Sequence, residues 1–279
     1  MAEIGALVIT RNEAANIADC LKSLQFCDER VVVDSFSDDQ TVALALPLAD
    51  HVYRRAFVNH AEQKNWGLAR LSTRWALIVD ADERVSPALA QELVALAAAD
   101  AADGFWIRRR NHFFGREIKG AGWGRDRVLR FFRRGYGWYP ERELHEEIEM
   151  LEGLRISQCA QRLHHHSYEG WQSSFERLLS YSQRGAAERR RRGRASNGGR
   201  IFFSPLQRFL RQYVAQGGFR DGAHGVALCG LSAVGIFLRE AKLATGDHEV
   251  PQVNAGRGGD SSVEVLKGRD PKGESHDEE

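Results

Sequence analysis

The chain has 279 residues, of which 43% are hydrophobic and 28% charged, with a formal net charge of +1. These values are typical of a globular protein with one sizeable α/β domain, and they exclude a strong global attraction to nucleic acid. The four cysteines form no C-x-x-C pair, which indicates a reducing, cytoplasmic compartment. We expect no signal peptide, because the N-terminus leads straight into the apolar strand-like run 4–9. We expect no membrane span, because the longest apolar stretch, 226–238, is shorter than the roughly 18–20 residues that a span needs.

The first hundred residues alternate between strand-like and helix-like segments. Asn12 is a candidate N-cap for a helix whose apolar positions begin at Ile17, and Ser86-Pro87 opens a later helix. Repeated β-α-β units predict a mostly parallel, doubly wound sheet. The predicted strands are 4–10, 30–34, 51–54 and 76–79, and the predicted helices after the first are 40–46, 61–71 and 87–99.

After residue 103 the pattern changes to strands of a mixed sheet and then to helices. Strands are predicted at 105–109, 128–132 and 156–163, and helices at 173–190, 205–215 (with Ser204 as N-cap) and 222–243. The polar, Gly-rich tail from 244 is predicted to be disordered. The expected domains are therefore 1–170 (a nucleotide-binding half 1–103 and an acceptor-side half 104–170), a helical, membrane-associating extension 171–243, and a tail 244–279.

Two carboxylates, Asp80 and Asp82, directly follow the apolar strand 76–79. Open α/β sheets bind their ligands at this end of the strands. Hard oxygen ligands of this kind suit Mg²⁺ or Mn²⁺, which would share coordination with substrate phosphates. The alternative is that these acids simply cap the helix that begins near Ser86.

Polar side chains also follow the first two strands. Thr10, Asn12 and Glu13 come after the first strand, and Asp34 ends the second. Because these ends share one edge of a parallel sheet, they should form one crevice, which Lys64 could reach from the preceding helix. Several acids, one basic side chain and a metal together suit a nucleoside diphosphate.

Four segments resemble the family 2 glycosyltransferases of the GT-A fold, in that family's order and spacing. They are Val8-Ile-Thr-Arg-Asn-Glu13, the loop 32–41, Gln63-Lys-Asn65 and Leu77-Ile-Val-Asp-Ala-Asp-Glu-Arg84. Segments 144–146, 163–168 and 217–222 are similar to the bacterial lipopolysaccharide inner-core β-1,4-glucosyltransferases. The resemblance covers about residues 4–242 and implies a GT-A type, mostly parallel Rossmann-like sheet with a mixed acceptor-side sheet and a helical C-terminal extension.

The resemblance implies an inverting, metal-dependent transfer of a hexose, glucose by subfamily, from a UDP-sugar to a lipid-linked glycan such as the lipopolysaccharide inner core. Asp82 would bind the Mg²⁺ or Mn²⁺, and Glu146, with Glu143 as second choice, would deprotonate the acceptor. The alternative for Glu146 is a solvated acid in the run 141–149. The expected donor-binding residues are Thr10, Asn12, Glu13, Asp34, Lys64 and Asp80.

Three consecutive histidines, 164–166, alternate faces in a strand and cannot all ligate one ion. One of them, His164 or His166, is a candidate to complete the cation site; otherwise they are packing and surface groups. Trp123, Arg125 and Arg127 are candidate acceptor-binding residues in an Arg-rich segment that suits a phosphorylated or carboxylated acceptor. A packed Trp and a solvated basic face are the alternatives.

The arginines at 189–192 lie close in sequence to the aromatic residues at 202 and 203, a pattern that indicates attraction to an anionic leaflet. We therefore expect a peripheral protein on the cytoplasmic face of the inner membrane, held there by this region and the apolar helix. Nucleic acid is the competing use of basic runs, but no base-reading module is recognisable. Two alternative functions stay open: a non-catalytic GT-A nucleotide-binding scaffold, and a Mg²⁺-dependent D-x-D phosphohydrolase with Asp80 as nucleophile.

Overall fold

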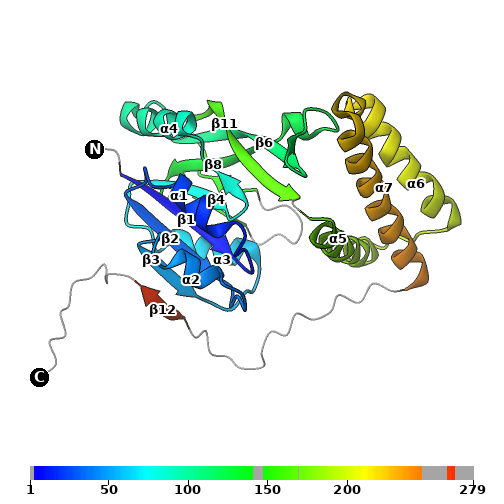
Figure 1. Cartoon of the computed structure of the whole chain (residues 1–279), viewed down its shortest axis with the longest axis horizontal. Coiled ribbons are helices and arrows are strands. Elements are labelled where there is room, and N and C mark those ends of the chain that lie inside the picture. The colour runs from blue at the N-terminus through cyan, green and yellow to red at the C-terminus, as the bar shows by residue number, and fades with distance from the viewer. Residues whose placement is uncertain (1–2, 141–146, 169, 247–262, 268–279) are drawn as a thin grey trace, which may run out of the picture. The chain divides into compact units, whose positions relative to one another are not determined.

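The computed structural model describes residues 3–140, 147–168, 170–246 and 263–267 (Figure 1). The chain forms two compact units. The first comprises 1–108, 127–164 and 255–279, and the second comprises 109–126 and 165–254. The division falls inside two strands, β6 (Gly104–Phe113) and β11 (Ile156–Tyr168), so that each strand contributes residues to both units.

The first unit begins with four parallel strands in the order β3-β2-β1-β4. Thr10 is in register with Asp34, and Ile9 with Asp80, so the three predicted polar strand ends lie abreast at one edge of the sheet. The strands are β1 (Ile4–Thr10), β2 (Glu29–Asp34), β3 (His51–Arg54) and β4 (Trp75–Asp80).

Helices cover both faces of this parallel half, because strand side chains alternate between the faces. Ala6 and Val8 of β1 join the core cluster that includes α1, α2 and α4, whereas Leu7 joins the cluster that includes α3. The helices are α1 (Ile17–Ser23), α2 (Thr41–Ala45), α3 (His60–Leu68) and α4 (Pro87–Ala99).

The sheet continues in the order β4-β8-β6-β11-β5, in which β8 pairs antiparallel with both β4 and β6. Both β6 and β11 run beyond the ends predicted from the sequence. The predicted fold class, a mostly parallel sheet with a mixed second half and a helical C-terminal part, is confirmed. The remaining short strands here are β5 (Glu83–Arg84), β7 (Arg116–Glu117), β8 (Arg127–Arg133), β9 (Gly137–Trp138) and β10 (Glu149–Met150).

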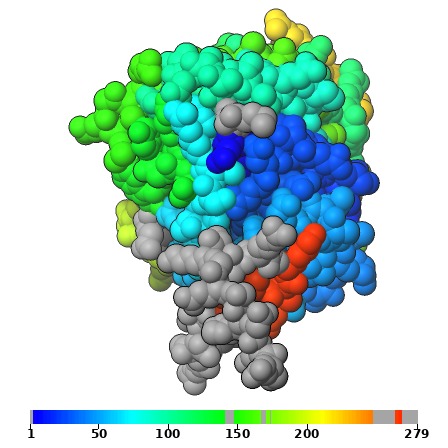
Figure 2. All heavy atoms as spheres, turned by 90° about the vertical axis from the view of Figure 1, so that its left-hand side faces the viewer, coloured from blue at the N-terminus to red at the C-terminus, as the bar shows by residue number. Residues whose placement is uncertain are grey.

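One segment of the predicted disordered tail is ordered, so that prediction was wrong there. Residues Glu264–Lys267 form β12, which pairs antiparallel with the edge strand β3 and lies on the surface of the first unit (Figure 2). Lys267 Nζ donates to the carbonyls of Leu46 and Ala49, both at 2.8 Å. These bonds satisfy carbonyl groups at and after the end of α2, a position where a lysine is favourable.

The second unit is a helical assembly built around α7. This helix packs against both α5 and α6 (Figure 1), and Leu228 and Cys229 on it join Phe113 and Ile118 in a small core. The helical elements are α5 (Trp171–Arg191), α6 (Gly198–Leu210), α7 (Gly222–Thr245), a π-helix Arg211–Ala215 and two 3-10 turns, Trp123–Arg125 and Gly218–Asp221.

Two predicted helix starts are wrong. The first helix is capped by Asn16 rather than Asn12, because Asn12 has a left-handed φ of 54° and belongs to the preceding loop. The helix predicted to start at Pro205 starts instead at Gly198, where the Asn197 side chain accepts from the Arg200 N–H. Pro205 therefore lies inside α6.

The expectation that no helix is long enough to span a membrane needs correction. The helical stretch Gly218–Thr245 has 28 residues, and its most apolar 18-residue window has a mean hydropathy of 1.4, so by length and composition alone it is long and apolar enough to cross a membrane. Only 28% of its most apolar part is buried within the protein. Core helices pass the same test, and α7 does pack on one side.

All four cysteines are free and buried, which predicts low thiol reactivity. Burial raises the pKa of Cys159 to about 12 and moves the pKa of Cys20 and Cys27 well above the ordinary thiol value. Because the thiolate is the reactive form, we expect a disulfide reagent at pH 8 to modify almost no thiol in the native protein and all four in denaturant. Rapid labelling of the native chain would contradict this.

Candidate donor and metal site

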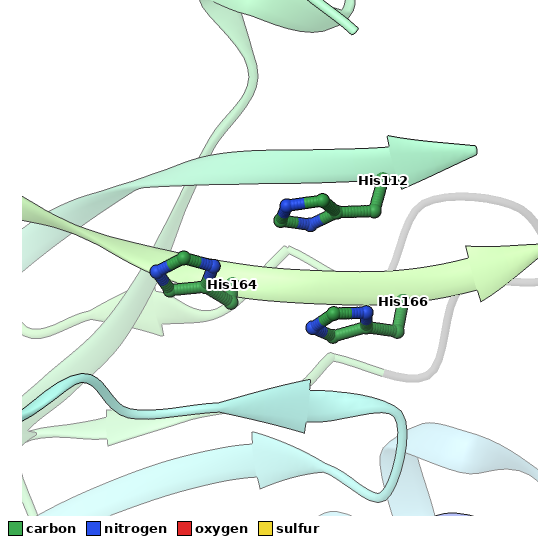
Figure 3. A group of neighbouring side chains, drawn as sticks. All are labelled: His112, His164 and His166. Carbon is green, nitrogen blue, oxygen red and sulfur yellow. The ribbon is translucent and has the colours of Figure 1, made fainter. Parts of the chain in front are cut away.

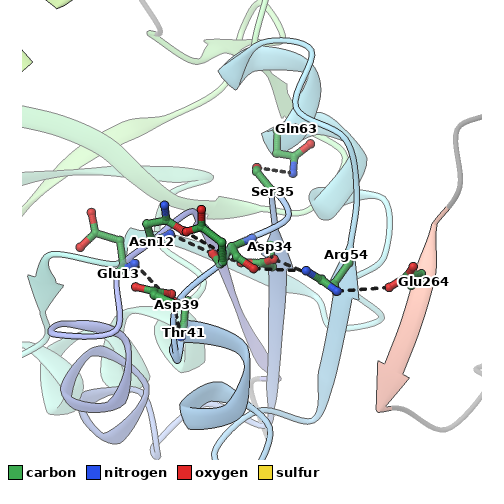
Figure 4. Close-up of polar contacts among 11 residues, drawn as sticks. Asn12, Glu13, Asp34, Ser35, Asp39, Thr41, Arg54, Gln63 and Glu264 are labelled. Atoms are coloured by element: carbon green, nitrogen blue, oxygen red, sulfur yellow. Dashed lines mark hydrogen bonds and ion pairs between the residues drawn. The ribbon is translucent and has the colours of Figure 1, made fainter. Parts of the chain in front are cut away.

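The loops that follow β1 and β2 are tied to each other (Figure 4). Asn12 N–H donates to Ser37 Oγ at 2.8 Å, and the Asn12 side-chain oxygen accepts from Asp38 N–H at 3.1 Å. Glu13 N–H donates to Thr41 Oγ1 at 2.8 Å. The predicted donor residues Asn12 and Glu13 are therefore brought to one place, on a loop pair whose shape is fixed by its own hydrogen bonds.

Asp34 lies beneath these loops and is completely buried. One of its oxygens accepts from the Ser37 N–H at 2.9 Å and the other from the Ser37 hydroxyl. The intervening Phe36 has a φ of 55°, a conformation that non-glycine residues rarely adopt. Asp34 thus holds a strained turn in place.

Arg54 links Asp34 to the C-terminal strand (Figure 4). Its Nε lies 3.7 Å from Asp34 Oδ2, its Nη1 lies 3.6 Å from Glu264 on β12, and its Nη2 donates to the Ser37 carbonyl at 3.2 Å. The guanidinium also lies over the Phe36 ring, 5.0 Å from its centroid. The loop after β2 is therefore supported by Arg54 of β3 and, through Arg54, by Glu264, which lies 230 positions after Asp34 in the chain.

Asp80, at the end of β4, is held by two buried basic side chains. Arg130 on β8 forms a two-pronged ion pair with it, and Lys64 Nζ on α3 lies 3.7 Å from Oδ1. Burial alone would lower the pKa of Arg130, but Asp80 and the neighbouring Glu83 raise it well above its ordinary value. Lys64 was expected from the sequence, whereas Arg130 was not, since it is one of nine arginines between 108 and 134.

Asp82 lies in the turn between β4 and β5, partly exposed. This turn is fixed on both sides: Glu83 accepts from the Asp80 N–H at 2.9 Å, and Arg84 Nη1 donates to the Ala81 and Glu83 carbonyls at 2.8 and 2.9 Å. The two carboxylates of the D-x-D motif consequently differ in environment. Asp80 faces two cationic side chains, and the partly exposed Asp82 carries the hard carboxylate oxygens that Mg²⁺ and Mn²⁺ prefer.

The three consecutive histidines alternate faces as expected, and another strand supplies a histidine that the sequence did not suggest. His165 Nδ1 lies 2.6 Å from the Asn111 side-chain oxygen, while His166 stacks on His112 of β6 with ring centroids 4.5 Å apart (Figure 3). His164 precedes His166 by two residues on β11, and one nitrogen from each of His112, His164 and His166 lies within 4.8 Å of the others. Imidazoles grouped in this way are common ligands of divalent cations.

The predicted acceptor residues have different environments. Trp123 is partly buried and packs against the core of the second unit, edge-on to Phe113, which favours the packed alternative. Arg125 is exposed, and Arg127 is exposed with its guanidinium 4.8 Å from the centroid of the Trp106 ring. Glu143 and Glu146, the candidate bases, lie outside the described residues.

Most arginines of the stretch 108–134 make specific internal contacts, which favours a structural role for much of this charge. Seven of the nine do so: Arg108 with the reoriented Gln158 amide, Arg109 with Asp126, Arg110 with Glu117, Arg127 with Trp106, Arg130 with Asp80, Arg133 with Asp100 and Asp103, and Arg134 with the Thr73 carbonyl.

The motif at 217–222 fixes a loop of the second unit. The Asp221 carboxylate accepts from the Lys119 and Gly120 N–H groups at 3.0 and 2.7 Å and is itself buried. Gly120 must lack a side chain, because a Cβ there would lie 2.2 Å from the Gly217 carbonyl oxygen. The loop that leads to Trp123 and Arg125 is therefore anchored at its base.

Replacing Asp221 with alanine should lower the free energy of unfolding by about 3 kcal/mol, because the buried Gly120 N–H and the part-buried Lys119 N–H lose a charged acceptor. Urea unfolding followed by circular dichroism measures this change. Asp221→Asn keeps one acceptor oxygen and should lose less. Equal stability of Asp221→Ala and the wild type would show that the two hydrogen bonds accepted by Asp221 contribute nothing to the free energy of unfolding.

The sequence places the chain in a known family. Residues 6–151 match the model of glycosyl transferase family 2, and the chain is 31% identical over 250 residues to the lipopolysaccharide core biosynthesis glycosyltransferase LpsC of Rhizobium meliloti (strain 1021). That match covers 86% of this chain and 91% of LpsC. The chain therefore belongs to glycosyl transferase family 2, as the motifs predicted, and the phosphohydrolase alternative is set aside.

A further relative matches over a shorter stretch, and two solved structures match at lower identity. An uncharacterised glycosyltransferase of Rickettsia felis is 38% identical over 104 residues, 37% of each chain. The structure of S. aureus TarS 1-349 in complex with UDP covers 88% of this chain and 92% of that chain, at 14% identity and a TM-score of 0.46. The mannosyltransferase PcManGT from Pyrobaculum calidifontis, in complex with GDP-Man and Mn²⁺, covers 88% and 79% at 17% identity and a TM-score of 0.46.

Proposed function

We propose that this protein transfers a hexose, most simply glucose, from a UDP-sugar to a lipid-linked glycan acceptor such as the lipopolysaccharide inner core, with inversion at the anomeric carbon. The observation that carries the proposal is the edge of the parallel sheet. There Asp80 is fixed by Lys64 and Arg130, Asp82 follows in a braced turn, and the loops after β1 and β2 are tied together.

The donor nucleotide would lie along these strand ends. The Thr10 hydroxyl is buried at the end of β1 and has no hydrogen-bond partner among the described residues, so it is available to a bound group. Asn12 and Glu13 lie next to Thr10, on the loop after β1 that is hydrogen-bonded to the loop after β2. Asp34 stabilises the loop after β2 by accepting from the Ser37 N–H. Asp80, oriented by its two cations, would accept from a ribose hydroxyl, and Lys64 would contribute positive charge near the nucleotide.

The residues at this edge fit a divalent cation. Asp82 would hold Mg²⁺ or Mn²⁺ with a carboxylate oxygen, and His164 is the candidate nitrogen ligand. When bound, the cation would act as a Lewis acid toward the departing diphosphate. The ion pairs of Asp80 support this division of roles, since its carboxylate already faces two positive charges.

The acceptor hydroxyl would be deprotonated by a carboxylate, for which Glu146 and then Glu143 are proposed. In a single in-line displacement this base lies opposite the leaving diphosphate. The relative LpsC is named for lipopolysaccharide core biosynthesis, which supports a lipid-linked acceptor, with Arg125 and Arg127 as candidate contacts. Such an acceptor would be met at the cytoplasmic face of the inner membrane.

The test is UDP release from a panel of UDP-sugars, with Mg²⁺, with Mn²⁺ and with a chelator. We expect slow hydrolysis of one UDP-sugar that needs the metal, and faster release once a heptose-containing core lipid is added. Calorimetric binding of UDP in the same buffers separates donor binding from turnover. No binding of any UDP-sugar with either metal would overturn the proposal and favour the non-catalytic scaffold.

A further inference from the structure

The second unit carries a concentration of positive charge around the start of α6. Residues 184–211 include nine arginines and a single acid, Glu188. Those with exposed side chains include Arg190, Arg192, Arg194, Arg200, Arg208 and Arg211. A run of this kind is often only a solvated surface, so its surroundings decide what it can do.

One buried carboxylate from α7 lies beneath this charge. Glu240 is fully buried and accepts from Arg189 Nη1 at 3.0 Å, Arg239 Nη2 at 2.8 Å and the Ser196 hydroxyl at 2.8 Å. Burial would raise the pKa of Glu240, but these hydrogen bonds and the positive charge of the two arginines lower it. A single carboxylate thus faces two arginines directly, with Arg194 and Arg200 close by.

Positive charge still dominates around Glu240, since the single acid of the stretch 184–211, Glu188, pairs with Arg192. Burial and the nearby Arg239, Arg194 and Arg200 all lower the pKa of Arg189, despite the opposing effect of Glu240. Arg208 is affected in the same way, by burial and then by Arg239 and Arg211. An anion bound among these guanidinium groups would relieve the repulsion.

The surface is hollowed next to the cluster. The hollow is lined by Gly193, Arg194, Ala195, Ser196, Asn197 and Arg200. Arg200 is oriented by donating from Nη1 to the Ala195 carbonyl at 3.0 Å. Planar guanidinium groups match phosphate oxygens in pairs, so the lining suits a phosphate group.

An apolar stripe begins directly beside this hollow. Phe202, Leu206, Leu210 and Val214 follow at intervals of four residues, which places them along one side of α6 and the π-helix that continues it. Their exposed fractions are 68%, 46%, 49% and 60%, and the neighbouring Phe203 is 65% exposed. Large apolar side chains gathered in this way mark an interaction surface.

We propose that this surface docks on an anionic phospholipid bilayer, with the hollow at Arg194 and Arg200 taking a lipid phosphate and the α6 stripe entering the acyl boundary. The positive charge favours an anionic bilayer over a second copy of this chain, because a second copy would place its own nine arginines against these nine and the two surfaces would repel each other. Basic residues flanking a strongly amphipathic helix suit the headgroup region of an anionic leaflet. The inference rests on the proposed function in one respect: a lipid-linked acceptor lies in the same membrane.

The experiment measures partition of the full-length protein onto phosphatidylcholine vesicles and onto vesicles that also contain phosphatidylglycerol. We expect binding only to the anionic vesicles, weakening with salt. Arg194→Gln/Arg200→Gln should lower the partition coefficient roughly 25-fold, about fivefold per arginine. Phe202→Ser/Phe203→Ser should lower it at least roughly tenfold. Lys22→Gln/Arg155→Gln, at exposed basic positions of the first unit, is the matched control and should bind as wild type.

Thermal unfolding of each variant identifies any that fail to fold. Equal binding to neutral and anionic vesicles, or binding that neither double variant weakens, would overturn the proposal. So would a wild-type dimer in gel filtration that Phe202→Ser/Phe203→Ser converts to monomer, because a second copy would then cover the stripe. UDP release without lipid should be the same in all variants, so a failure of the proposed function would appear there and not in vesicle binding.

Discussion

Asp82→Asn should lower metal-dependent UDP release by about a thousandfold while leaving the protein folded. The change removes the negative charge of the carboxylate that the D-x-D turn presents, but keeps its size. Lewis-acid stabilisation of a departing diphosphate is worth several kcal/mol, and each 1.4 kcal/mol is about tenfold in rate. Because Asp82 is partly exposed in a turn fixed by Glu83 and Arg84, the substitution should change stability little.

The measurement combines UDP release with calorimetric Mn²⁺ binding in the presence of UDP. We expect the affinity for Mn²⁺ to fall with the rate, which distinguishes a lost ligand from a displaced loop. Asp19→Asn, an exposed acid on α1, is the matched control and should behave as wild type. Full activity of Asp82→Asn, or activity that resists a chelator, would remove Asp82 from the metal site.

Arg130→Met should lower the free energy of unfolding by about 3 kcal/mol and weaken UDP binding. Arg130 is buried and neutralises Asp80, with the buried Glu83 also close enough to raise its pKa. Removing one partner of such a pair leaves charge uncompensated in a low-dielectric environment, and that cost exceeds the value of the pair itself. Lys64 remains near Asp80, with Nζ 3.7 Å from Oδ1, but it does not replace the two-pronged pairing of the guanidinium.

Urea unfolding of Arg130→Met, Asp80→Asn and the double variant measures the coupling between the two residues. The double variant should be more stable than Arg130→Met, because the unpaired carboxylate has been neutralised. Arg127→Met tests an exposed arginine on the same strand and should cost less than about 1 kcal/mol. If Arg130→Met were as stable as Arg127→Met, the ion pair would have no structural role.

Much of the donor edge could be predicted from local patterns alone. Apolar runs that end in Thr10, Asp34 and Asp80 predicted three strand ends, and the parallel register places them abreast as expected. Element positions were predicted well where one local signal dominates, as at Ser86-Pro87 before α4. Prediction failed at Asn12 and Pro205, where two local signals compete and the tertiary environment selects one.

The sequence by itself determined the β-α-β order, the family and the acids at the strand ends, because each depends on residues adjacent in the chain. Only the tertiary structure decided which distant groups complete them. Arg130 reaches Asp80 across 50 positions, His112 meets His166 through strand pairing, and Glu264 reaches Arg54 from β12. Such contacts leave no local signal in the sequence. Nothing in the sequence distinguishes Arg130 from the other eight arginines of 108–134, and it meets Asp80 because β8 lies next to β4 in the sheet.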